Sequence, residues 1–90
     1  EVTVFESGDI ASFNNDELKI QFNETATATL DNDDVLSDAS FNIHINGIEK
    51  TLTLEIVNAR AHPVIIDGYS LKLDFADGYS QTCGIIVKKL

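Results

Sequence analysis

The stretch FNIHINGIEKTLTLEI, residues 41–56, decides the fold of this chain. Apolar side chains occupy alternate positions before and after Asn46-Gly47, as in strands that bury one face and expose the other. Asn-Gly is a preferred pair for a two-residue type I′ turn, because both turn positions take positive φ. Such a turn pairs Ile45 with Ile48 and aligns most of the apolar positions on one face. We therefore predict an antiparallel hairpin over this stretch.

The same alternation recurs along the chain, and turn residues divide it into strands. Asp67-Gly68 predicts a second two-residue hairpin. For residues 76–78 we predict a three-residue loop with its glycine in the left-handed region, because that register sets Phe75 opposite Tyr79 and matches apolar with apolar residues. It also points Tyr69 and Tyr79 toward the apolar face. The expected strands are residues 2–6, 17–22, 25–30, 40–46, 48–57, 63–66, 69–75 and 79–88.

The remaining segments indicate connections within a single domain, residues 1–90. Asn23-Glu24 predicts a fourth turn, and residues 7–16 and 31–38 are expected to be irregular, the second with one helical turn. No window of the chain repeats apolar residues at the helical spacing. Roughly seven or eight short strands separated by such turns indicate an all-β fold, an antiparallel β-sandwich of immunoglobulin-like or Greek-key type.

The charge of the chain restricts its partners. Acidic residues outnumber basic ones 15 to 6, and the net charge is −9. Nucleic acids and anionic lipid surfaces bind clustered Lys and Arg, so neither is an expected partner. An acidic surface instead favours cations or a protein partner with a basic surface.

Cysteine content and hydropathy add two further expectations. Cys83 is the only cysteine, which excludes an internal disulfide, and we expect it in the core as a small apolar residue. No run approaches the ~18 apolar residues of a membrane span, so we expect no membrane insertion. The chain begins at Glu1 without a methionine, which is consistent with processing after secretion or with a domain cut from a longer chain. Of these we expect an extracytoplasmic mature protein, either secreted, periplasmic or at the cell surface.

The acidic segment DNDDVLSD, residues 31–38, is the candidate metal site. Calcium takes about six to eight oxygen ligands, and this segment is dense in carboxylates. Its spacing is not that of an EF-hand, and a solvated turn is the alternative, because Asp and Asn favour turns for local reasons. A second polar cluster, residues 14–17, is expected to approach it in the folded sheet. The candidate calcium ligands are Asp31, Asp33, Asp34, Ser37 and Asp38.

Residues 33–38, Asp-Asp-Val-Leu-Ser-Asp, resemble the N/D-N/D-x-x-S/T-S calcium motif of the βγ-crystallins, with Asp in place of the final Ser. The resemblance implies a calcium-stabilised domain of two Greek keys. The aromatic-x-x-x-x-aromatic-x-Gly signature of that family is not matched, since Phe5 is followed by Ile10 and Ser12. Residues 52–78 are similar to the latter half of immunoglobulin-like modules. A βγ-crystallin-like sandwich is therefore the alternative to an immunoglobulin-like one.

The segment NARAHP, residues 58–63, is the candidate partner-binding loop. It holds Arg60, the only arginine, together with His62. An exposed Arg on a loop between two strands can enter a protease pocket or pair with a carboxylate of a partner. Pro63 favours extended geometry at the preceding residue. A plain connection between strands is the alternative.

These features favour a non-catalytic extracytoplasmic module that binds another protein through loops or an exposed sheet face. One alternative is an enzyme inhibitor, acting through residues 58–63 or by acidic mimicry of nucleic acid, and another is a calcium-stabilised structural domain of βγ type. The chain has no G-x-S-x-G elbow and no Gly-rich phosphate loop, so we expect no enzyme, and no cofactor other than calcium. The uncharged segment TATATL, residues 25–30, is expected at a sheet edge that can pair with another molecule.

Overall fold

The computed structural model describes all 90 residues and contains nine strands and no α-helix. It therefore has no helix that is long and apolar enough to cross a membrane. The strands are β1 Val2–Glu6, β2 Ile10–Phe13, β3 Leu18–Thr29, β4 Val35–Ile45, β5 Ile48–Val57, β6 Arg60–His62, β7 Val64–Ile66, β8 Tyr69–Asp77 and β9 Thr82–Lys89.

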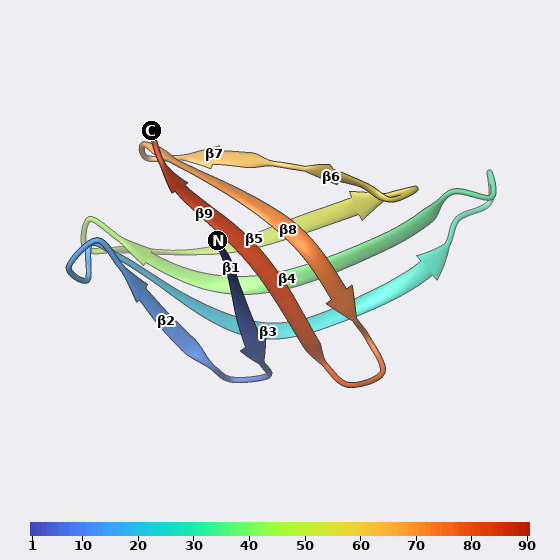
Figure 1. The fold of residues 1–90 in the computed structure, drawn as a ribbon, viewed down its shortest axis with the longest axis horizontal. Helices are drawn as coiled ribbons and strands as arrows, with labels where there is room; N and C mark the ends of the chain where they lie inside the picture. The colour runs from blue at the N-terminus through green and yellow to red at the C-terminus, as the bar shows by residue number, and fades with distance from the viewer.

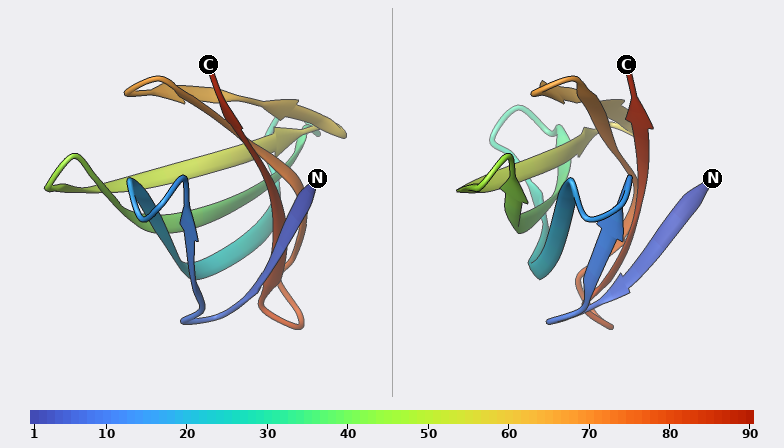
Figure 2. Two further views of the ribbon diagram at one scale, coloured as in Figure 1. Left: turned by 60° about the vertical axis from the view of Figure 1, so that its left-hand side comes forward. Right: turned by 90° about the vertical axis from the view of Figure 1, so that its left-hand side faces the viewer.

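Two antiparallel sheets pack face to face, as Figure 1 and Figure 2 show. The four-stranded sheet has the order β1-β9-β8-β7, and the five-stranded sheet has the order β2-β3-β4-β5-β6. The chain passes between the sheets after β1 and again at Pro63, where β6 leads into β7. The predicted all-β sandwich is confirmed. Its strand order is that of a meander closed by the pairing of β1 with β9, rather than a Greek key.

The core lies between the two sheets and is built from the alternating apolar positions of the sequence. It contains 14 buried residues, among them Cys83, whose expected burial is confirmed. Three phenylalanine rings meet inside it: the ring centroid of Phe41 lies 6.1 Å from that of Phe5 and 5.6 Å from that of Phe22. Complete burial of such a side chain contributes about 1.5–3 kcal/mol, so this contact between the sheets is a main source of stability.

The two-residue hairpins form as the sequence predicts. Asn46 and Gly47 both take positive φ, and Ile45 pairs with Ile48 across that turn. Asp67 and Gly68 also take positive φ, and Ile66 of β7 pairs with Tyr69 of β8 across that turn. In both cases the short loop fixes the register, which is why these predictions succeed.

The predicted turn at Asn23-Glu24 is wrong, because β3 runs through it. A register shift between Phe22 and Glu24 marks a bulge instead of a reversal of direction. The expected irregular segments are also shorter than predicted. Residues 10–13 form β2, and β4 begins at Val35, so that only a tight turn and no helical turn separates β3 from β4.

The predicted three-residue loop between β8 and β9 is wrong as well. Phe75 pairs with Gly84, not with Tyr79, and a register shift between Leu73 and Phe75 marks a second bulge. The connection is a longer turn over residues 78–81, in which Gln81 rather than the glycine takes positive φ, 55°. The longer turn sets the register of residues 75–77, and the bulge shifts the register of residues 69–73 by one residue. The sequence offers no glycine at the bulged position to reveal it.

Candidate interaction surface

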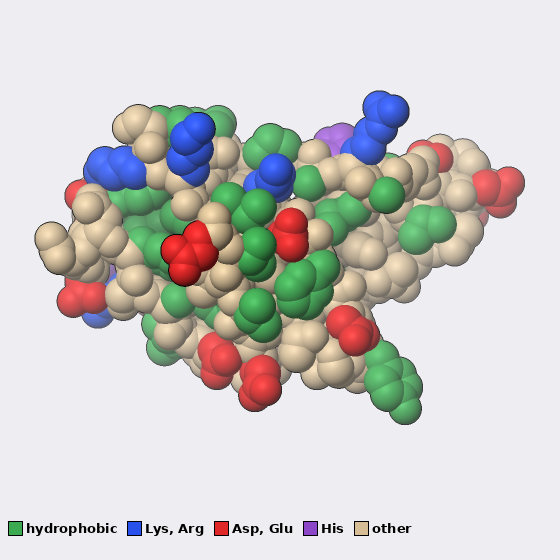
Figure 3. Space-filling view, in the orientation of Figure 1, with side chains coloured by type: hydrophobic (Ala, Val, Ile, Leu, Met, Phe, Trp, Pro, Cys, Tyr) green, Lys and Arg blue, Asp and Glu red, His purple; other side chains and the backbone are tan.

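The outer face of the four-stranded sheet carries a cluster of apolar side chains outside the core. Val2 and Val4 of β1 are 39% and 61% exposed, and Phe75 of β8 is 38% exposed. Ile86 of β9, the strand between them, pairs with Val2 and is half-buried. We call these four residues the outer patch. Figure 3 shows the apolar surface in the middle of this face.

Phe75 reaches the outer face because of the bulge in β8. Leu73 points into the core, and the extra residue, Asp74, reverses the alternation that follows it. The Phe75 ring then lies over Gly84 of β9. A β-carbon at Gly84 would overlap this ring and lie 2.8 Å from Val2 Cγ1. Glycine inside a strand commonly marks such a close approach, and here it lets the Phe75 and Val2 side chains meet.

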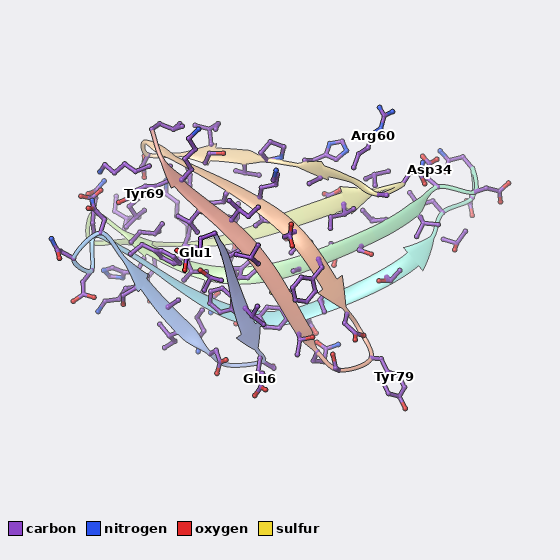
Figure 4. All side chains as sticks on the ribbon, in the orientation of Figure 1. Glu1, Glu6, Asp34, Arg60, Tyr69 and Tyr79 are labelled. Atoms are coloured by element: carbon purple, nitrogen blue, oxygen red, sulfur yellow. The ribbon has the colours of Figure 1, made fainter.

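Tyr79 stands at one end of this face, on the turn between β8 and β9. Its side chain is fully exposed and points away from the body of the molecule, as Figure 4 shows, so the expectation that it faces the core is wrong. Asp77 Oδ1 accepts hydrogen bonds from the N–H groups of Tyr79 at 2.9 Å and Ser80 at 3.3 Å. Hydrogen bonding by Ser80, and then by Tyr79, lowers the pKa of Asp77. The turn is therefore braced, and it presents an aromatic residue of the kind that anchors protein interfaces.

Acidic groups border this surface on several sides. Glu1 and Glu6 lie at the two ends of β1 and are labelled in Figure 4. Asp74 and Asp77 lie on either side of Phe75 along β8. Two lysines are basic neighbours: Lys72 of β8 pairs with Ile86 of the outer patch, and Lys88 of β9 lies two residues after Ile86 on the same face. The surface is thus apolar at its centre, with four acidic residues and two lysines around it.

The structure does not bring the five candidate calcium ligands together. Both carboxylate oxygens of Asp34 accept hydrogen bonds, from Asn58 Nδ2 at 2.8 Å and Asn32 Nδ2 at 3.0 Å. Ser37 and Asp38 are successive residues of β4, so their side chains point to opposite faces. No three of the His, Cys, Asp and Glu side chains are gathered as a metal site would require. Calcium binding stays a prediction that this arrangement does not favour.

Residues 14–17 do not approach residues 31–38, because they lie at opposite ends of the continuous β3 (Figure 1). Glu17 instead joins the two sheets. Its Oε1 accepts hydrogen bonds from Lys89 Nζ at 2.7 Å and from the Tyr69 hydroxyl at 2.8 Å. The bond from Lys89, and then the bond from Tyr69, lower the pKa of Glu17, and the same contact raises the pKa of Lys89. This cluster closes one end of the sandwich.

The candidate loop at residues 58–63 is a tight turn followed by an edge strand. Asn58 and Ala59 take positive φ, and β6 then pairs with β5 through Arg60 and His62. Both side chains are exposed, and Figure 4 shows Arg60 pointing into solvent. The structure places the two residues side by side on one strand without an ion pair, and protease binding there stays a prediction.

No family model, curated protein or solved structure matches this chain. The site is therefore judged from its own geometry. The sequence patterns missed Phe75 and Tyr79 as surface residues, because a bulge and a four-residue turn reorient them. Gly84 inside an apolar run was the one available signal, since a strand glycine often lies under a side chain from the next strand.

Proposed function

We propose that this chain is a non-catalytic module that binds another protein through the outer patch and Tyr79. The outer patch itself carries the proposal: apolar side chains are held out of the core on a solvent-exposed sheet face. Contiguous apolar patches of this kind mark interaction sites, whereas single exposed apolar residues are ordinary. The proposal follows from this grouping, and not from the exposure of any one residue.

The surroundings of the outer patch suit a partner whose binding surface is apolar at its centre and has basic groups around it. The acidic residues at Glu1, Glu6, Asp74 and Asp77 would face those basic groups, and the net charge of −9 would draw such a partner toward the chain. Phe75 is held over Gly84, and Tyr79 stands on a braced turn. Little side-chain entropy is therefore lost at Phe75, and little backbone entropy at Tyr79, when a partner binds.

The side chains that could act as nucleophile or base support a non-catalytic role. Burial raises the pKa of the Cys83 thiol to about 12, so very little thiolate exists at neutral pH. His44 and His62 lie in two strands of the five-stranded sheet that are not neighbours. Neither a reactive thiol nor a pair of adjacent histidines is therefore available to catalysis, which supports the proposal.

The test begins with capture of binding proteins from the native source on the immobilised chain and their identification by mass spectrometry. The dissociation constant of each purified candidate is then measured against variants. We expect Val4→Ser to weaken binding about tenfold, because an exposed valine that becomes buried contributes about 1.5 kcal/mol. Tyr79→Ser should weaken it by at least as much.

Ile48→Ser is the matched control. Ile48 is 55% exposed, close to the value for Val4, but it lies beside the β4–β5 turn of the other sheet. Its dissociation constant should stay within about twofold of the unmodified chain. Equal losses for the Val4 and Ile48 variants, or no loss for Val4→Ser and Tyr79→Ser, would contradict the proposal.

A further inference from the structure

β1 is an open edge of the four-stranded sheet. It pairs with β9 along its whole length and has no strand on its other side. The chain leaves that side after Glu6, because β2 pairs with β3 of the other sheet along all four of its residues. Figure 2 shows β1 and β2 diverging from the turn that joins them, with β1 at the margin of the molecule. The backbone of β1 is therefore accessible along one side, which we call the open side.

Hydrogen bonds at the end of β1 show which residues face the open side. Glu6 C=O accepts from Asp9 N–H at 2.9 Å, and Glu6 N–H donates to Asp9 Oδ2 at 2.9 Å. Both backbone groups of Glu6 therefore point away from β9. Because the two directions alternate along a strand, the N–H and C=O groups of Val2 and Val4 also point to the open side. There is no strand there to receive them.

The other side of the β1–β9 pair agrees with this assignment. Leu90 N–H donates to Gly68 C=O at 2.8 Å, so the backbone of Leu90 points to the β8 side of the sheet. Ile85 lies five residues earlier, an odd number, and therefore points to β1, where it pairs with Thr3. The hydrogen bonds between β1 and β9 are thus made by Thr3 and Phe5, and those of Val2 and Val4 are left over.

The open side lacks the features that usually protect a sheet edge, which are charged residues, proline or a bulge. The edge strand β6 contains Arg60, and the edge strand β7 follows Pro63. The residues Val2–Phe5 contain no charge and no proline, and their register with β9 is unbroken. Val2 and Val4 add apolar side chains beside this edge, on the outer face of the sheet.

The segment of β3 that was predicted at a sheet edge, residues 25–30, is not open in the same way. The Gln81 side-chain amide bonds both backbone groups of Thr25, at 3.1 Å and 3.0 Å. Gly78, on the β8–β9 turn, lies directly against the backbone of Ala26. Pairing of residues 25–30 with another molecule stays a prediction that this arrangement does not favour.

We infer that the β1 edge pairs antiparallel with the β1 edge of a second copy of the chain. Residues 2–4 read Val-Thr-Val, which is the same in both directions and is centred on Thr3. A two-fold axis at Thr3 sets Val2 opposite Val4 of the second copy, and Val4 opposite its Val2. Both members of each pair point to the open side, so each pair exchanges two backbone hydrogen bonds. The two four-stranded sheets then form one continuous sheet.

The pairing also joins the outer patches of the two copies. Each Val2 gains a Val4 of the other copy as its neighbour across the strands, which reduces the apolar surface exposed to water. The apolar surface then runs from Phe75 of one copy to Phe75 of the other. The inference goes beyond the proposed function, because such a dimer presents two identical contacts to a binding protein.

The dimer should become stronger as salt is added. Two chains of charge −9 repel one another, and Glu1 and Glu6 lie at the ends of each β1. Salt screens this repulsion over a length of about 30 Å at 0.01 M and about 10 Å at 0.1 M. Raising the ionic strength should therefore strengthen the association severalfold. Weakening by salt would show that opposite charges hold the copies together, and would overturn the inference.

Disulfide trapping tests the register directly. In the inferred pairing the two Thr3 residues face each other as a non-hydrogen-bonded pair, with Cα atoms about 4.5 Å apart, which is within the range that a disulfide spans. The two Val4 residues are offset along the strands, and their Cα atoms lie about 8 Å apart, beyond that range. Oxidised glutathione should therefore convert a Thr3→Cys variant to a covalent dimer at least tenfold faster than a Val4→Cys variant.

Val4 is a demanding control, because exposure alone favours the opposite order of rates. Val4 is 61% exposed, whereas Thr3 is half-buried. Cys83 is fully buried and stays out of the reaction. A Val4→Cys chain that dimerises as fast as the Thr3→Cys chain would indicate random collision and overturn the inference.

Sedimentation equilibrium of the unmodified chain provides a second measurement that does not depend on folding of a variant. The weight-average mass should rise above 9.9 kDa with concentration, and rise further with salt. The paired stretch is short, so we expect a dissociation constant on the order of 0.1–1 mM. A mass that stays at the monomer value up to about 1 mM chain in high salt would overturn the inference.

Val4→Pro identifies the edge that is used. It removes an N–H that faces the open side and leaves the hydrogen bonds to β9 intact, so it should abolish the rise in mass. Val4→Ala is the matched control: it removes most of the side chain but keeps the N–H, and it should still associate. A rise that persists in Val4→Pro, or that is lost equally in both variants, would overturn the inference.

Discussion

Replacing Gln81 by alanine should destabilise the fold far more than a surface substitution normally does. The Gln81 side chain forms three hydrogen bonds, with Thr25 N–H at 3.1 Å, Thr25 C=O at 3.0 Å and Gly78 C=O at 2.7 Å. These bonds fasten the β8–β9 turn of one sheet to β3 of the other. Thr25 is 4% exposed, so water replaces its lost partner poorly.

The expected loss follows from the number of bonds and their surroundings. Each hydrogen bond contributes about 1 kcal/mol net, and a buried group left unpaired costs about 1–3 kcal/mol. Because Gly78 C=O can be solvated, we expect Gln81→Ala to lower the free energy of unfolding by about 2–3 kcal/mol. That is a large share of the ~5–15 kcal/mol typical of a domain.

Equilibrium unfolding in urea measures this difference. The midpoint should fall while the slope of free energy against urea stays constant, since the surface exposed on unfolding hardly changes. Gln21→Ala is the matched control, because the side chain of Gln21 makes a single long contact of 3.5 Å with Gly8 C=O. The control should change the free energy by no more than about 0.5 kcal/mol. A loss below that limit for Gln81→Ala, or equal losses for both variants, would refute the role assigned to Gln81.

Three further outcomes are expected. Gly84→Ala should lower the free energy of unfolding in urea by about 1–3 kcal/mol, because the added methyl group displaces the Phe75 ring. The loss should be smaller when the same substitution is made in a Phe75→Ala variant. An equal loss in both backgrounds would contradict this packing. Glu17→Gln should lower stability at neutral pH, and the difference from the unmodified chain should vanish on acidification. The hydrogen bonds from Lys89 and Tyr69 hold the folded-state pKa of Glu17 below its usual value, so the contribution of Glu17 is lost as pH falls through that lowered pKa. A difference that persists at about pH 2, where the carboxyl group is protonated, would argue against the ion pair with Lys89. Cys83 should react with a thiol reagent only as fast as the chain opens, and reaction at the rate of a free thiol would show that it is not buried.

The parts of the fold that the sequence predicts are those governed by local chemistry. Asn46-Gly47 and Asp67-Gly68 can adopt the two positive φ values of a tight hairpin, and such a loop leaves one register only. The alternating apolar residues then determine which face is buried. For these reasons the hairpins, the core and the sandwich class are readable without a structure.

The parts that were mispredicted depend on bulges. At Asn23 and at Asp74 an extra residue enters a strand, and in neither case does a glycine mark it. Each bulge reverses the faces of all residues that follow in the strand. Phe75 therefore reaches the outer face, although its spacing from Leu73 places it in the core. The candidate surface follows from this reversal, so sequence periodicity alone could not have located it.

The candidate calcium ligands lie apart in the structure for a different reason. Asp34 is engaged by the amides of Asn32 and Asn58, and the second of these lies 24 residues away in the chain. A dense run of carboxylates signals a metal site only when their oxygens remain free and converge. Here the contact with Asn58, distant in sequence, uses the Asp34 carboxylate to fix the tip of the β3–β4 hairpin.

The pairing of β3 with β4 is tested most directly by amide hydrogen exchange, residue by residue. The backbone groups of Thr25 point away from β4, and Leu30 N–H donates across the hairpin, so the N–H groups of Ala26 and Ala28 should point to β4 and be protected, while that of Thr29 should exchange rapidly. Equal protection of all three amides, or rapid exchange at Ala26 and Ala28, would contradict this strand arrangement.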